Sequence, residues 1–114
     1  MLPRRSTAWA RLCVSLRFEW DEDKAAGNVR KHAIAFAEAS TLFTSGVDYL
    51  EIFDVKHSAE EERFICIGPI SRGIVVVVTV DVDIDVIRII SARLATRRES
   101  VLYADFLQER FDGR

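Results

Sequence analysis

The chain has 114 residues and a mass of 13.0 kDa, which is enough for one hydrophobic core and too little for two. Apolar residues make up 49% of the chain and charged residues 30%, as in ordinary globular proteins. Sixteen basic and eighteen acidic residues give a formal net charge of −2, which excludes a uniformly basic nucleic-acid-binding domain. A local basic patch remains compatible with this average.

The longest apolar run, residues 73–80, is much shorter than the roughly 18 residues that a membrane helix needs, so we expect no membrane association. Cys13 and Cys66 lie far apart and form no CxxC pair. This usage is typical of idle thiols in a reducing compartment, which predicts a cytoplasmic protein.

The N-terminal segment carries Pro3-Arg4-Arg5 before a partly apolar stretch that Arg11 interrupts, which is a poor match to a signal peptide. We therefore expect residues 1–16 to be a flexible extension, or the product of a start codon assigned too far upstream. Residues 17–112 are predicted to form one domain.

Alternating polar and apolar residues predict a short strand over Leu16–Trp20. Asp21 is a candidate N-cap for a helix that ends at His32, with acidic residues in its first turn and basic residues in its last. The spacing of apolar residues predicts a second, short helix over Phe36–Phe43.

Four further strands are predicted, over Tyr49–Val55, Arg63–Ile67, Ile74–Val80 and Val86–Ala92. A turn is predicted at Gly68-Pro69. The strand at residues 74–80 is β-branched almost throughout, which is typical of a strand that is buried on both faces. Thr96 and Glu99 match a capping box at the start of a last helix. Leu102, Tyr103, Phe106 and Leu107 are its predicted apolar face. Grouped strands between helices predict an α+β fold with an antiparallel sheet.

Charge is distributed unevenly along this order. Residues 86–102 contain one acid, Glu99, and four arginines, which are Arg88, Arg93, Arg97 and Arg98. Residues 48–62 contain six acids and one lysine. This segregation suits a protein that binds phosphate on one face, although a solvated strand edge and helix start would look the same.

No metal motif is present. His32 and His57 are 25 residues apart and lack a second ligand at a metal-binding spacing. Residues 81–85 begin like a calcium loop but lack its glycine and its final glutamate, so they are interpreted as a charged hairpin tip. We expect neither a metal nor another cofactor.

Several segments together resemble the BrnT family of type II toxin–antitoxin toxins. They are Phe18-Glu19-Trp20-Asp21, Arg30-Lys31-His32, Glu61-Glu62-Arg63-Phe64, Ser71-Arg72-Gly73 and residues 86–93, continued by Arg98-Glu99 and Tyr103. The resemblance covers about residues 17–104. It departs from the family at Ala33, where a glycine is usual, at Ala35, where a capping serine or aspartate is usual, and at the turn of residues 83–85, which usually contains glycine.

The resemblance implies a RelE-like α+β fold with an antiparallel sheet of four to five strands, two N-terminal helices and one C-terminal helix. It also implies an endoribonuclease that uses no metal and in which the 2′-hydroxyl of the RNA attacks the neighbouring phosphate. The reaction then needs cations for the charged phosphorane, a base and an acid.

For the phosphate clamp the resemblance suggests Arg63, Arg88 and Arg93, with Arg97 or Arg98 on the flanking backbone. Arg72 and Trp20 are further RNA-binding candidates, and Lys31, His32 and Tyr103 are candidate bases. Several of these residues have a structural alternative. Arg63 can pair with Glu61 or Glu62, and Arg93 can cap a carbonyl. Trp20 and Tyr103 can be core residues, whereas Lys31 and His32 can be helix-end charges.

The resemblance further implies an RNA substrate and a BrnA-type antitoxin, whose ribbon-helix-helix domain binds operator DNA, so that this chain reaches DNA only through the antitoxin. A second interpretation is a non-catalytic module derived from such a toxin, which binds the antitoxin and regulates transcription.

Overall fold

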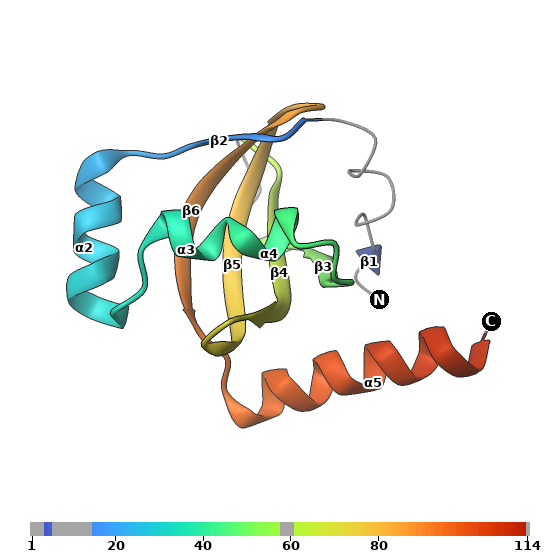
Figure 1. Ribbon diagram of the computed structural model, residues 1–114. Coiled ribbons are helices and arrows are strands. Elements are labelled where there is room, and N and C mark those ends of the chain that lie inside the picture. The colour runs from blue at the N-terminus through green and yellow to red at the C-terminus, as the bar shows by residue number, and fades with distance from the viewer. Residues whose placement is uncertain (1–3, 6–14, 58–60, 114) are drawn as a thin grey trace.

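Six strands form one sheet in the computed structural model, which describes residues 4–5, 15–57 and 61–113. The order across the sheet is β1-β3-β4-β5-β6-β2 (Figure 1). The strands are β1 (Arg4–Arg5), β2 (Arg17–Glu19), β3 (Leu50–Phe53), β4 (Arg63–Ile70), β5 (Gly73–Asp83) and β6 (Val86–Leu94). The helices are α2 (Glu22–His32), α3 (Phe36–Ala39), α4 (Thr41–Thr44) and α5 (Arg97–Gly113), and a 3-10 turn, η1, spans Val55–His57.

The predicted α+β class is confirmed, and every pair of neighbouring strands is antiparallel except β2 and β6. The predicted antiparallel sheet of four to five strands is confirmed for the body of the sheet, and the structure adds detail at its two edges. One edge gains the two-residue β1, and at the other β2 pairs with β6 in parallel, through Phe18 opposite Ile87. A three-residue edge strand gives no sequence signal for its partner or direction.

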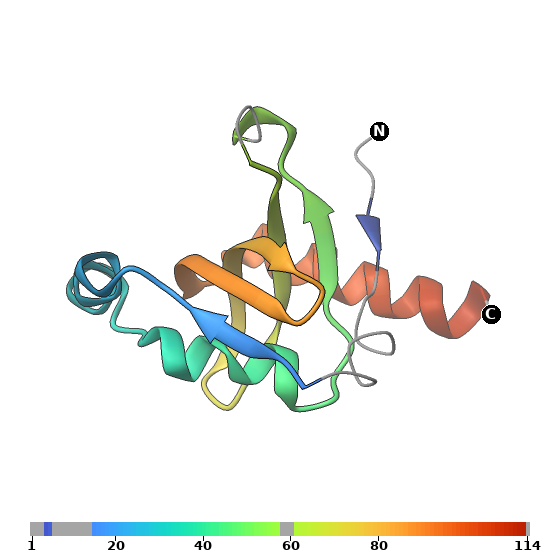
Figure 2. The same ribbon diagram turned by 90° about the horizontal axis from the view of Figure 1, so that it is seen from above.

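Two layers of helix cover opposite faces of the sheet (Figure 2). Helices α3 and α4 pack on one face, where the larger core cluster includes Phe36, Leu42, Val75 and Ile89. Helix α5 lies on the other face, where Tyr103 and Phe106 pack against a smaller cluster on β3, β4 and β5. Strand β5 is buried on both faces because both helical layers cover it, as its run of valines predicts.

Helix α2 begins and ends as the sequence predicts. The Asp21 carboxylate accepts hydrogen bonds from the backbone N–H groups of Asp23 and Lys24, at 2.8 and 3.2 Å. Ala33 ends the helix in the left-handed conformation, with φ of 60°. Because a left-handed residue with a Cβ costs roughly 1–2 kcal/mol, Ala33 occupies a position that favours glycine.

The second predicted helix is divided in two at Ser40. The Ser40 hydroxyl donates to the carbonyl of Ala37 at 2.6 Å, and the Thr41 hydroxyl donates to that of Glu38 at 2.7 Å. Such side-chain bonds compete with the helical ladder. Ala35, at the N-cap of α3, makes no side-chain capping bond, so α3 lacks a contribution of about 1 kcal/mol.

The predicted turn at Gly68-Pro69 is wrong, because β4 continues to Ile70 and the turn lies at Ser71 and Arg72. Strand β3 pairs with β4 only as far as Ile67. On the β3 side of β4, Pro69 therefore has no neighbouring strand that would need its missing N–H. A Cβ on Gly68 would lie 2.7 Å from Leu42 Cδ1 and 2.9 Å from Tyr49 Cβ. This glycine is therefore required by close packing of α4 on the strand.

The predicted hairpin tip is confirmed, since residues 84–85 form the turn between β5 and β6. The predicted capping box is confirmed as well: the Thr96 N–H donates to Glu99 and the Glu99 N–H donates to the Thr96 hydroxyl, at 2.8 and 3.2 Å. Most of the predicted N-terminal extension, including Cys13, lies outside the described residues, and the division at residue 16 stays a prediction. Cys66 is buried, and its thiol donates to Glu51 Oε2 at 3.8 Å.

Among the residues that the structure describes, no helix has the length and apolarity that would let it cross a membrane.

Candidate functional site

Four charged side chains form a continuous row across the sheet, on the face that carries α5. Register places Arg63 of β4 opposite Val80 of β5, Val80 opposite Arg88 of β6, and Arg88 beside Glu19 of β2. Residues that pair across neighbouring strands point to the same face. Glu61, two residues before Arg63, completes what we call the charge row: Glu19, Arg88, Glu61 and Arg63.

Ion pairs connect the members of the charge row. Arg88 Nε donates to Glu19 Oε2 at 2.8 Å, and its NH1 lies 3.6 Å from Glu61 Oε2. Glu61 Oε1 lies 3.9 Å from Arg63 NH2, so one carboxylate contacts both guanidinium groups. The four side chains are 30 to 44% exposed, so a ligand can reach them from solvent.

The side chains of Arg63 and Arg88 approach one another although their strands are not neighbours. The backbones of Arg63 and Arg88 are two strands apart, about 10 Å at a strand spacing of about 4.8 Å. Their guanidinium groups converge on the Glu61 carboxylate between them. An RNA phosphodiester carries one negative charge, as a carboxylate does, and guanidinium can bind either anion through paired N–H groups. Arg63 and Arg88 thus share one anionic partner, the Glu61 carboxylate, at 3.9 and 3.6 Å.

The structure brings Arg63 and Arg88 together, as predicted from sequence, and separates Arg93 from them. Arg93 lies opposite Val76, four residues along β5 from Val80, which corresponds to about 13 Å. It donates two hydrogen bonds to Glu99, both at 2.8 Å. These bonds lower the pKa of Glu99 to about 2 and raise that of Arg93. Arg93 therefore joins β6 to the start of α5.

The three predicted bases all lie outside the charge row. Tyr103 is buried and its hydroxyl donates to the backbone carbonyl of Asp48 at 2.7 Å, which fastens α5 to the loop before β3. Burial, with Asp48 close by, raises its pKa. Lys31 and His32 end α2, one turn beyond Asn28, whose side chain is bonded to Ala92. The contact of Asn28 with Ala92 places Lys31 and His32 at the opposite end of β6 from Arg88.

The remaining RNA-binding candidates divide into paired and unpaired side chains. Arg72, in the β4–β5 turn, binds both carboxylate oxygens of Glu38, at 2.6 and 3.1 Å. Trp20 packs edge-on against Phe36, with ring centroids 5.9 Å apart, and belongs to the larger core. Arg97 and Arg98 are exposed in the first turn of α5. Neither has an ion pair with another described residue.

Sequence reasoning alone does not identify Glu19 as a member of the site, and it indicates Glu61 only as a possible partner for Arg63. The alternation in Arg17-Phe18-Glu19 indicates that Glu19 shares a face with Arg17, but it cannot reveal that β2 pairs with β6. Within the described ranges, no group of three or more histidine, cysteine, aspartate or glutamate side chains is arranged to hold a metal ion.

Comparison with known proteins identifies the family. Residues 20–99, more than half of the chain, match the family model for the ribonuclease toxin BrnT of type II toxin–antitoxin systems. The crystal structure of the Brucella abortus ribonuclease toxin, BrnT, is similar to this chain with a TM-score of 0.55 and 25% sequence identity. The alignment covers 73% of this chain and 100% of that one. A comparison with curated protein sequences gives no match. The chain belongs to the BrnT family of toxins of type II toxin–antitoxin systems.

Proposed function

We propose that this toxin is an endoribonuclease that cleaves RNA at the charge row, with Arg63 and Arg88 holding the scissile phosphate. The observation that carries the proposal is the shared contact of both arginines with the Glu61 carboxylate, at 3.9 and 3.6 Å. Two guanidinium groups that already hold one oxyanion are arranged to hold another.

In the proposed reaction, the 2′-hydroxyl of the RNA attacks the adjacent phosphorus. The 2′-oxygen–phosphorus bond forms, the bond from phosphorus to the 5′-oxygen breaks, and the products carry a 2′,3′-cyclic phosphate and a 5′-hydroxyl. Arg63 and Arg88 stabilise the extra negative charge on the phosphorane oxygens, because guanidinium keeps its charge at any working pH.

Glu61 is the proposed proton acceptor for the 2′-hydroxyl. When the phosphate takes the place of its carboxylate between the arginines, Glu61 remains beside the reacting centre because it is only two residues from Arg63 in the chain. The 5′-oxygen takes its proton from solvent as it leaves. Glu19 keeps its 2.8 Å bond to Arg88 and so orients that guanidinium.

The test is digestion of total RNA by the purified protein in the presence of EDTA, with analysis of the product ends. Cleavage with 2′,3′-cyclic phosphate ends supports the proposal. Cleavage that stops when EDTA is added contradicts the arginine-based mechanism. Intact RNA together with tight binding of the antitoxin supports the second function, a non-catalytic antitoxin-binding module.

A matched pair of variants tests Glu61 as the base. Glu61→Gln preserves the shape of the side chain and is expected to lower the rate of cleavage by about 10²- to 10⁴-fold, the usual contribution of a general base. Glu62→Gln changes the next residue, which is exposed, and is expected to leave the rate unchanged. Equal rates for the two variants would exclude Glu61 as the proton acceptor.

A further inference from the structure

The charge row by itself cannot draw RNA from solution. Its two arginines are balanced by two glutamates, so its formal charge is zero. At the same end of the sheet, the β5–β6 hairpin carries Asp81, Asp83 and Asp85, and Arg17 pairs with Asp85 at 3.6 Å, so the acids there outnumber the cation. A polyanion approaching this end meets no net attraction. The positive charge that attracts RNA must therefore lie elsewhere on the molecule.

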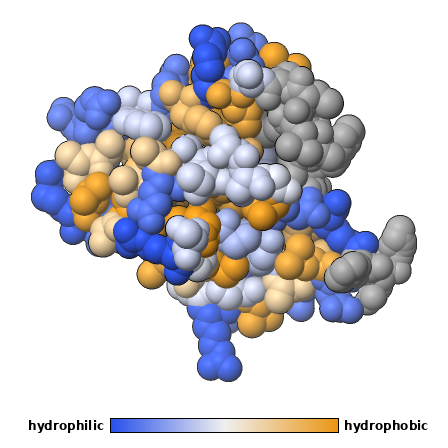
Figure 3. Space-filling view, in the orientation of Figure 1, coloured by the Kyte–Doolittle hydropathy of each residue, from blue (hydrophilic) through white to orange (hydrophobic). Residues whose placement is uncertain are grey.

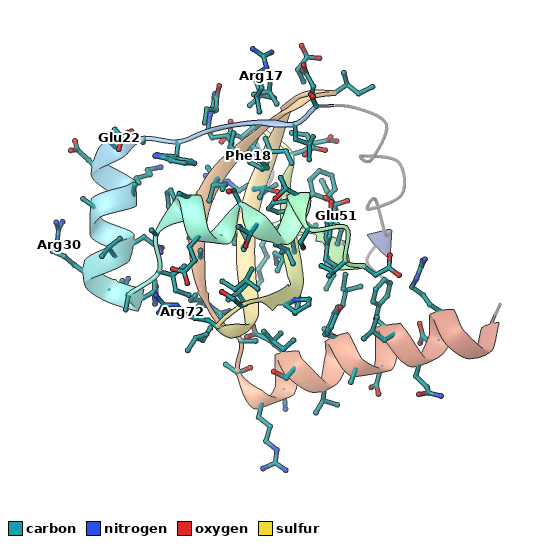
Figure 4. The ribbon with its side chains drawn as sticks, viewed as in Figure 1. Arg17, Phe18, Glu22, Arg30, Glu51 and Arg72 are labelled. Atoms are coloured by element: carbon teal, nitrogen blue, oxygen red, sulfur yellow. The ribbon has the colours of Figure 1, made fainter. Side chains whose placement is uncertain are left out.

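Four exposed cations lie on the last turn of α2 and the first turn of α5: Arg30, Lys31, Arg97 and Arg98, which we call the basic rim. Among the described residues, none of the four has a hydrogen-bonded or ion-paired acid. Figure 4 shows Arg30 projecting outward from the side of α2 that faces away from the sheet, Arg72 at the lower turn and Arg17 at the upper edge. In the space-filling view, hydrophilic side chains lie at the left margin, and one projects from the lower margin (Figure 3).

Two contacts bring the helices of the basic rim to the same end. The Asn28 side chain accepts a hydrogen bond from the Ala92 N–H at 3.1 Å and donates to its carbonyl at 2.8 Å, which fixes the last turn of α2 beside β6. Strand β6 then ends at Leu94, and α5 begins three residues later at Arg97. Arg30 and Lys31 therefore lie at the end of β6 where Arg97 and Arg98 follow.

Folding stability does not account for the arginines of α5. The positive end of a helix dipole lies at its first turn, where a cation is unfavourable and an acid favourable. Arg97 and Arg98 occupy that turn, and its acid, Glu99, is engaged by Arg93. In contrast, Arg30 and Lys31 lie in the last turn of α2, where the dipole favours them. The helix dipole therefore gives no stabilising reason for two arginines at this position.

We propose that the basic rim binds the phosphate backbone of single-stranded RNA and so delivers the strand to the neutral charge row. This inference rests on the proposed ribonuclease function and adds a second, non-catalytic RNA contact to it. Arg93 lies between the two regions on the same face as Arg88, as their pairing with Val76 and Val80 shows. A strand that follows β6 therefore passes from the basic rim to the charge row.

The test measures the salt dependence of binding to a fluorescein-labelled 2′-O-methyl RNA 15-mer, which has no free 2′-hydroxyl and cannot be cleaved. Each phosphate contact on a single strand contributes about 0.7 to the slope of log K against log salt concentration. Arg97→Gln with Arg98→Gln, and separately Arg30→Gln with Lys31→Gln, are each expected to reduce that slope by about 1.4.

Two controls separate charge from folding. Lys24→Gln removes an exposed cation from the first turn of α2, at the other end of the same helix, and is expected to leave the slope unchanged. Arg97→Lys with Arg98→Lys keeps the charge and is expected to keep the slope. Loss of binding in this lysine variant would point to a structural effect and contradict the proposal.

The outcomes also distinguish this inference from the proposed function. Unchanged slopes in both glutamine double variants would overturn the basic rim as an RNA contact, whether or not the protein cleaves RNA. If those variants bind the RNA normally but lose the antitoxin, the surface serves an acidic protein and the inference is wrong. Normal rim-dependent binding without any cleavage of unmodified RNA would leave the inference standing and overturn the ribonuclease proposal.

Discussion

Arg93 and Glu99 form a two-point ion pair, with NH1 and NH2 of the arginine each 2.8 Å from one carboxylate oxygen of the glutamate. The same carboxylate accepts the Thr96 N–H, so one side chain joins the end of β6, the connecting loop and the first turn of α5. This junction sets the position of α5 and, with it, that of Arg97 and Arg98.

The first prediction concerns pH. The pKa of Glu99 falls from 4.5 to about 2, chiefly because of the hydrogen bonds from Arg93. A lowered pKa in the folded state stabilises the protein above pH 4.5, and this contribution is lost as pH falls from 4.5 toward 2. Glu99→Gln is expected to destabilise the protein by about 1 kcal/mol near neutral pH. Urea unfolding from pH 2 to 7 should show this difference shrinking below pH 4.5. A difference that is constant with pH would contradict the assignment.

The second prediction concerns Asn28, which is buried and makes three hydrogen bonds, to Ile34 O, Ala92 O and Ala92 N–H. Asn28→Ala leaves these backbone groups without partners inside the protein, so we expect a loss of about 2–4 kcal/mol in unfolding free energy. Chemical denaturation measures this loss. Ala26→Ser, at an exposed position of the same helix, serves as the control and should change stability by less than about 0.5 kcal/mol.

The third prediction concerns the left-handed end of α2. Ala33→Gly removes the Cβ that makes its φ of 60° unfavourable, and the gain exceeds the entropy that glycine adds to the unfolded chain. We expect a stabilisation of about 0.5–1 kcal/mol, seen as a higher midpoint in thermal unfolding. Ala26→Gly, in the middle of the helix, should instead destabilise by about 1 kcal/mol. Destabilisation by both changes would show that Ala33 is not strained.

The fourth prediction compares two glycines. Gly68→Ala places a Cβ 2.7 Å from Leu42 Cδ1 and 2.9 Å from Tyr49 Cβ, and is expected to cost about 1–3 kcal/mol. Gly27→Ala meets only the Arg30 guanidinium, at 3.7 Å, and should stabilise α2 by about 1 kcal/mol. Circular dichroism during urea unfolding measures both changes. Equal effects of the two substitutions would contradict the close packing of α4 on β4.

Local sequence patterns predicted the local features. The capping bonds of Asp21 and Thr96, the buried β5 and the charged tip at residues 84–85 each follow from a few neighbouring residues. The failures occur where a distant contact overrides local preference. Gly68-Pro69 is a typical turn pair, yet the two residues continue β4 because they pair with Val75 and Ile74 of β5.

The candidate site shows the same limit. Sequence indicated Arg63 and Arg88 as members of one site, and the structure places them in one row. The sequence alone could not reveal that Glu19 joins that row, because the parallel pairing of β2 with β6 brings together residues that are 69 positions apart. The sequence alone also could not show that Arg93 lies outside the row. Arg93 and Arg88 face the same side of the sheet because a bulge in β6 lies between them.

The most direct test of the charge row as the catalytic site compares Arg88→Gln with Arg17→Gln in single-turnover cleavage of RNA. Both residues lie at one edge of the sheet and each pairs with an acid, Arg88 with Glu19 and Arg17 with Asp85. Loss of phosphate stabilisation is expected to lower the rate for Arg88→Gln by about 10²- to 10³-fold, while Arg17→Gln cleaves at the rate of the unmodified protein. Equal rates for Arg88→Gln and the unmodified protein would contradict the assignment of the charge row as the site of cleavage.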